Sequence, residues 1–126
     1  MRAGKKGFIL AVCGILLLGL TAVGWADKSS VTIEAPATAQ KGSEITVKVN
    51  VAHNGNSVAH YTQWVSVKVN GKEIERWEYG AFKRPESDTF SKEVKITVDG
   101  PLEITAKASC NLHGSAGPAK ATVGLK

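Results

Sequence analysis

The chain has 126 residues, enough for one domain of ordinary size, and its formal net charge at neutral pH is +5. Its basic residues form no arginine-rich stripe, and only Trp77 and Tyr79 lie close enough together to suggest a platform for stacked bases. The composition therefore argues against a nucleic-acid-binding protein, and we expect no nucleic-acid partner.

Residues 1–26 are predicted to be a secretory signal peptide. A basic start is followed by an apolar run from Phe8 to Val23 and then by small residues up to Ala26, the order of parts typical of such a segment. We expect cleavage after Ala26 and a periplasmic or otherwise exported domain of residues 27–126. The alternative is an uncleaved anchor, the one case in which we expect a membrane contact.

Short runs that alternate apolar and polar residues follow one another after residue 27, which is typical of strands with one buried face. There are seven such runs: 31–33, 45–51, 65–69, 72–81, 90–98, 102–108 and 121–125. No segment has a convincing helical period, and Asn70-Gly71 is typical of a tight hairpin turn. The pattern predicts an all-β, immunoglobulin-like antiparallel β-sandwich of about seven strands. We expect Trp64, which precedes the third run, to pack in its core.

If successive strands alternate in direction, the loops divide between two ends of the sandwich. One end, which we call the histidine pole, then receives residues 27–29, 52–63, 82–88 and 110–118. All three histidines of the chain and Cys110 fall in these loops.

Cys110 is the one cysteine of residues 27–126, so an internal disulfide is excluded there. It lies three residues before His113, a spacing that lets one tight loop present a thiolate and an imidazole to one ion. His53 and His60 belong to another loop of the same pole. These four residues are the predicted metal ligands.

Imidazole and thiolate suit iron, copper or zinc, and they do not suit calcium or magnesium. A blue-copper centre usually has a weak axial methionine, whereas Met1 is the single methionine of this chain. A blue-copper centre with a different axial ligand and a closed structural zinc site stay open as alternatives on these residues alone.

The run Ser109-Cys110-Asn111-Leu112-His113-Gly114, together with the loop from His53 to His60 that leads into Trp64, resembles the iron domain of superoxide reductases, the neelaredoxin and desulfoferrodoxin family. Residues 31–36 resemble the start of that domain. The resemblance implies an immunoglobulin-like sandwich and one mononuclear, non-haem iron that cycles between ferrous and ferric states. It also implies reduction of superoxide to hydrogen peroxide, with electrons from an unidentified donor protein. A homo-oligomer is compatible with it.

By the same resemblance, Cys110 is expected on the axis of the iron, and His53, His60 and His113 in the plane. The family has an acid-lysine-histidine stretch before its first strand, where this chain has Asp27-Lys28-Ser29. Lys28 is therefore the candidate catalytic residue, expected to attract superoxide and stabilise the product, whereas a serine replaces the fourth histidine. That replacement keeps an alternative open: an exported carrier of a metal or a sulfur compound without turnover.

Overall fold

The structure, a computed structural model, describes residues 28–126. The predicted signal peptide lies outside the described residues. Within them, no helix is long and apolar enough to cross a membrane.

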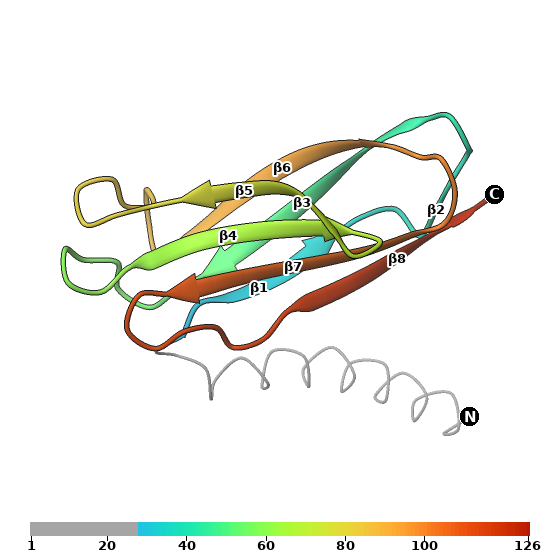
Figure 1. Cartoon of the computed structure of the whole chain (residues 1–126). Coiled ribbons are helices and arrows are strands. Elements are labelled where there is room, and N and C mark those ends of the chain that lie inside the picture. Colours follow the sequence, from blue (N-terminus) through green and yellow to red (C-terminus); the bar gives the residue numbers. More distant parts are fainter. Residues whose placement is uncertain (1–27) are drawn as a thin grey trace, which may run out of the picture.

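The described residues form two β-sheets and no helix (Figure 1). The strands are β1 (Ser30–Glu34), β2 (Thr38–Ala39), β3 (Glu44–Ala52), β4 (Thr62–Val69), β5 (Lys72–Glu78), β6 (Thr89–Thr97), β7 (Leu102–Cys110) and β8 (Ala119–Leu125). One sheet has the order β1-β3-β6 and the other the order β2-β8-β7-β4-β5. The predicted all-β sandwich is confirmed, and each of the seven predicted runs contributes a strand.

The additional strand is β2, which has two residues and pairs with β8 in parallel. Pro36 separates it from β1. Because proline has no backbone N–H, it cannot continue a ladder of hydrogen bonds. The chain leaves the three-stranded sheet here and joins the edge of the other sheet.

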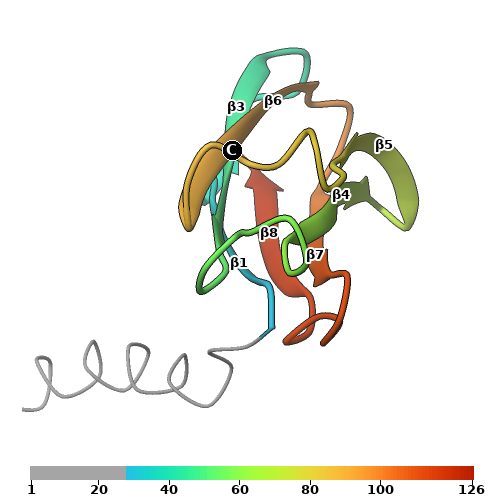
Figure 2. The same cartoon turned by 90° about the vertical axis from the view of Figure 1, so that its left-hand side faces the viewer.

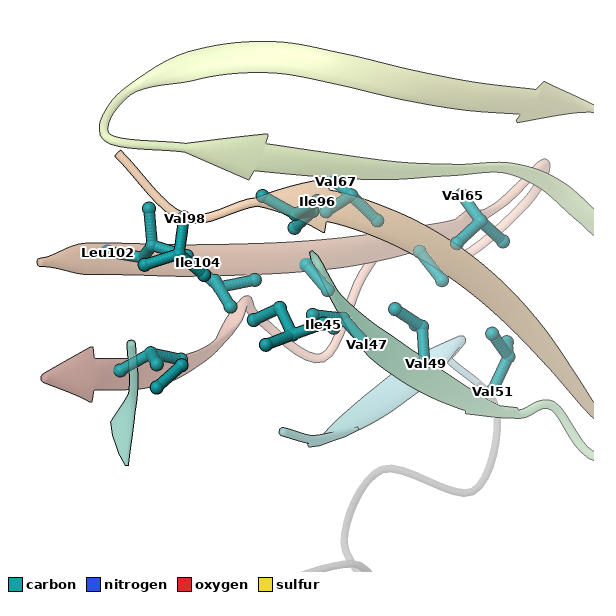
Figure 3. Packing of buried hydrophobic residues seen from close by; sticks show 14 of the residues in the cluster. Ile45, Val47, Val49, Val51, Val65, Val67, Ile96, Val98, Leu102 and Ile104 are labelled. Atoms are coloured by element: carbon teal, nitrogen blue, oxygen red, sulfur yellow. The ribbon is translucent and has the colours of Figure 1, made fainter. Parts of the chain in front are cut away.

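The core lies between the sheets and follows the alternation of the strands (Figure 3). On β3, Val47 and Val49 are fully buried, and they face Val65 and Val67 of β4 together with Ile104 of β7. Fully burying one such side chain contributes about 1.5–3 kcal/mol. The two sheets and this shared core form the frame from which the loops extend.

Trp64 is not part of this core, so its predicted packing was wrong. Val65 and Val67 point inward, which turns Trp64 toward the outer face of the five-stranded sheet. There the guanidinium carbon of Arg76 lies 4.4 Å from the ring centroid, the geometry of a cation–π contact.

The predicted hairpin turn between β4 and β5 is confirmed. Asn70 and Gly71 have φ values of 51° and 85°, which a two-residue turn of this kind requires. This turn lies at the end of the molecule opposite the histidine pole (Figure 1).

The histidine pole forms as the alternation of strands predicts. The loops after β3, β5 and β7 gather at one end of the sandwich, next to the start of β1 (Figure 1), and Figure 2 looks onto this end. Segments that are about 30 and 50 residues apart in the sequence are therefore neighbours in space.

Candidate metal centre

The structure brings three of the predicted ligands into one cluster at the histidine pole. The ligating atoms of His53, His60 and Cys110 all lie within 4.8 Å of one another. His53 directly follows β3, His60 lies shortly before β4, and Cys110 ends β7. Three different strands therefore position the three side chains.

The fourth predicted ligand, His113, adjoins this cluster. Its Nδ1 lies 3.0 Å from Nε2 of His60 and 4.0 Å from Sγ of Cys110. The same Nε2 atom of His60 also lies 3.2 Å from Nε2 of His53. The His60 ring stands nearly edge-on to both neighbouring rings, with interplanar angles of 81° and 83°.

The two nitrogen-to-nitrogen spacings fit neighbouring ligands of a single metal ion. Nitrogen ligands bound at about 2.0–2.1 Å lie about 2.9 Å apart at right angles and about 3.3 Å apart in a tetrahedron. The two nitrogen-to-nitrogen distances, 3.2 and 3.0 Å, fall in that range. Three imidazole nitrogens and one sulfur are also a donor set that suits iron.

Cys110 lies in a tight turn that surrounds its sulfur with donors. Its N–H donates to the carbonyl of Gly114 at 2.8 Å, and the N–H of Gly114 donates back to the carbonyl of Cys110 at 3.1 Å. Within the turn, the N–H groups of Leu112 and His113 point at Sγ, at 3.4 and 3.5 Å. Such bonds stabilise a thiolate and tune the metal that it binds, and Cys110 itself is only 3% exposed.

The histidines differ in burial. His53 is 2% exposed, His60 is partly buried, and His113 is exposed. Burial lowers the pKa of His53 below its ordinary value of 6.5, and a hydrogen bond with Asn56 opposes part of this effect. Since a metal binds neutral imidazole, His53 is kept in the form that a ligand needs.

Asn111 joins two loops of the histidine pole around His60. Its Oδ1 accepts the N–H of Tyr61 at 2.9 Å, and its Nδ2 donates to the carbonyl of Ala59 at 3.1 Å. The residues before and after His60 are thereby held by one side chain. The sequence alone does not reveal this role, because an asparagine in a simple turn would look the same. The partners of Asn111 are about 50 residues away in the sequence.

Ser29, which stands where the family resemblance expects a fourth histidine, is fully buried. Its Oγ lies 2.9 Å from Oγ1 of Thr62, and its N–H donates to the carbonyl of Gly114 at 3.3 Å. The serine hydroxyl is therefore engaged with Thr62. Lys28, directly before it, is partly buried, and its predicted catalytic role stays a prediction.

A comparison with known protein families agrees with the resemblance seen in the sequence. A family model described as Desulfoferrodoxin matches residues 23–115. No curated protein sequence matches the chain.

Three solved structures illustrate the likeness in fold. A superoxide reductase (neelaredoxin) from Ignicoccus hospitalis is similar with a TM-score of 0.66 and 20% identity, over 83% of this chain and 86% of that one. A putative superoxide reductase from Thermotoga maritima has a TM-score of 0.58 and 19% identity, over 77% and 86%. The CARDB domain of a Pyrococcus furiosus protein, solved in complex with di-metal ions, has a TM-score of 0.62 and 16% identity, over 80% and 94%. At these identities the structural likeness shows the fold alone.

Proposed function

The chain belongs to the desulfoferrodoxin family, and from this premise we propose that it is a superoxide reductase whose single iron is held by His53, His60, Cys110 and His113. The observation that carries the proposal is the convergence of three imidazole nitrogens and one sulfur at the histidine pole. When bound, iron would supply one-electron redox chemistry and a Lewis acid for the superoxide anion.

The protein's own residues would divide the remaining tasks. Cys110 would bind the metal through its buried sulfur, at which the N–H groups of Leu112 and His113 point. His113 is the exposed member of the cluster, and small molecules would approach the site from its side. Lys28 would attract the anion to this end of the molecule.

The proposed reaction converts superoxide, one electron and two protons into hydrogen peroxide. The electron comes from a donor protein, and the protons come from water at the exposed side of the site. No oxygen is produced, which distinguishes a reductase from a dismutase.

The test is to load the full-length protein with ferrous iron without oxygen and to expose it to a pulse of superoxide. We expect about one iron per chain, rapid loss of superoxide, and one hydrogen peroxide for each superoxide consumed, without oxygen release. Decay of superoxide at its uncatalysed rate, or no retained iron, would reject the proposal.

A second candidate is a carrier that binds a metal or a sulfur compound without turnover. It is favoured by Ser29, because the hydroxyl at the position of the fourth family histidine bonds with Thr62. A carrier should release its cargo to a competing chelator within minutes and should not accelerate superoxide loss. Retention of iron together with rapid superoxide consumption would exclude this reading.

We also propose that the protein acts outside the cytoplasm, as residues 1–26 predict. Fractionation of cells that express the full chain, followed by sequencing of the amino terminus, tests this. A mature protein that begins at Asp27 in the exported fraction is the expected result. A full-length chain in the membrane fraction would favour the anchor instead.

A further inference from the structure

The Asn56 side chain makes three polar contacts next to the candidate metal centre, and the family motif does not include it. Its Oδ1 lies 2.8 Å from Nδ1 of His53 and also accepts the N–H of Thr62 at 2.8 Å. Its Nδ2 donates to the carbonyl of Ser87 at 2.9 Å. One carboxamide thus contacts a candidate ligand, the start of β4 and the loop before β6.

These partners determine how the carboxamide is oriented. A backbone N–H can only donate, so the atom that faces Thr62 must be the oxygen. A carbonyl can only accept, so the atom that faces Ser87 must be the nitrogen. The two contacts agree, and they place Oδ1 of Asn56 against His53.

The orientation of Asn56 in turn determines which nitrogen of His53 carries the proton. Because Oδ1 can only accept, Nδ1 of His53 must donate and therefore holds the hydrogen. In the neutral ring, Nε2 then has a free lone pair. This nitrogen is the one that lies 3.2 Å from Nε2 of His60, on the side of the metal cluster.

We propose that Asn56 is a positioning residue that holds His53 in the Nδ1–H tautomer and aims its Nε2 lone pair at the metal site. The inference rests on one part of the proposed function, namely that His53, His60, Cys110 and His113 bind a metal. Asn56 is not one of the predicted ligands, yet by this proposal it determines which nitrogen of His53 binds the metal.

The backbone around Asn56 supports this role. The N–H of His53 donates to the carbonyl of Asp88 at 2.8 Å, and the N–H of Asn56 donates to a carboxylate oxygen of the same residue at 3.2 Å. Both ends of the His53–Asn56 pair are thus attached to the loop before β6. These backbone contacts hold the pair as a unit.

Two measurements test the proposal, on the full-length protein. The first is ¹⁵N NMR of the metal-free protein at a pH where the histidines are neutral, which reports the tautomer of each ring. The second is titration with Co²⁺, whose affinity and visible spectrum report the metal site. The variants are Asn56→Leu, which keeps the shape and removes both polar atoms, and Asn56→Asp, which keeps the acceptor and loses the donor to Ser87. Asn54→Leu, at an exposed position of the same loop, is the matched control.

We expect the Nδ1–H tautomer of His53 in the wild type, in Asn56→Asp and in the Asn54 control. Asn56→Leu should lose that preference and bind Co²⁺ about 10- to 100-fold more weakly, the usual cost of removing an outer partner of a ligating histidine. Partial recovery of affinity in Asn56→Asp would mark the acceptor oxygen as the active feature.

Three results would overturn the proposal. One is a wild-type His53 with its proton on Nε2, a measurement that needs no variant and no metal. Another is an Asn56→Leu protein with unchanged tautomer and affinity. The third is an equal loss in Asn56→Asp and Asn56→Leu, which would assign the effect to the Ser87 contact. Failure of the proposed function has a different signature, namely a correct tautomer in a protein that binds iron but does not consume superoxide.

Discussion

Asn111 and Tyr61 are 50 positions apart in the sequence and exchange two hydrogen bonds. The N–H of Tyr61 donates to Oδ1 of Asn111 at 2.9 Å, and the N–H of Asn111 donates to the carbonyl of Tyr61 at 3.0 Å. This reciprocal pair fastens the loop that carries His60 to the turn that carries Cys110 and His113. The geometry of the candidate metal centre therefore depends on a contact between two residues outside the predicted ligand set.

Replacing Asn111 with alanine should weaken both the fold and the site. The change leaves the N–H of Tyr61 without its partner, which costs about 1–3 kcal/mol of unfolding free energy. Because His60 loses the support on both sides, we expect metal affinity to fall about 10- to 100-fold. Leu112→Ala is the control, since that side chain is 62% exposed. Urea unfolding measures the stability of both variants, and metal titration measures their affinity. Equal losses in Asn111→Ala and Leu112→Ala would count against the role of Asn111.

Replacing Cys110 with serine should remove the soft ligand while the turn stays intact. A neutral hydroxyl binds iron poorly, so the loss of affinity should exceed the about 100-fold typical of outer partners. The oxidised, iron-loaded protein should also lose the visible absorption that arises from thiolate bound to ferric iron. Ser109→Ala is a suitable neighbour control. A variant that keeps the wild-type spectrum would show that Cys110 is not a ligand.

The metal-free protein should become less stable as the pH falls below about 6.5. Burial lowers the pKa of His53 in the folded state, so the unfolded chain takes up a proton at a higher pH than the folded chain does. Stability is then fully present above the unfolded pKa and is lost as the pH falls toward the folded pKa. Urea unfolding in the presence of a chelator should show this slope, and His53→Gln should reduce it. An unchanged slope in the variant would assign the pH dependence to other groups.

Gly114→Ala should strain the cysteine turn. Gly114 has a φ of +76°, which costs a residue with a side chain about 1–2 kcal/mol, although nothing lies within 4 Å of the position of an added Cβ. The matched control is Gly100→Ala, which also has open space but no positive φ. We expect a lower thermal midpoint and weaker metal binding only for Gly114→Ala. Equal midpoints for the two variants would show that the turn relaxes without cost.

Lys28→Gln should slow the reaction with superoxide. Removing a positive charge near the site reduces the attraction of an anion, so the second-order rate should fall by up to about tenfold at low salt. The dependence of that rate on ionic strength should also weaken. Lys72→Gln, at the opposite end of the sandwich, should leave the rate unchanged. The same small loss in both variants would indicate a general charge effect and no specific role for Lys28.

Much of the architecture could be predicted from local sequence patterns. The alternation in β3 predicted which residues are buried, because side chains of a strand point to opposite faces in turn. Asn70-Gly71 predicted its turn because few other residues adopt positive φ. Trp64 escaped this reasoning: its direction follows from the inward neighbour Val65, whereas hydrophobic character alone suggested the core.

The candidate ligands could be predicted because alternating strands place every second loop at the same end of a sandwich. His53, His60, Cys110 and His113 could thus be assigned to one pole without coordinates. Their distances and their differences in burial could not, since these depend on how the loops pack against one another.

The sequence by itself determined the all-β class, the strands other than β2 and the set of candidate ligands, because these follow from patterns within short stretches of the chain. Only the tertiary structure decided that Oδ1 of Asn56 contacts Nδ1 of His53, that Asn111 bonds with the residues beside His60 and that the Ser29 hydroxyl bonds with Thr62. Each of these contacts joins two particular atoms within the histidine pole. Which atoms meet depends on the final path of every loop there. Hydrogen bonds are short and directional, so no local pattern in the sequence could predict these partners.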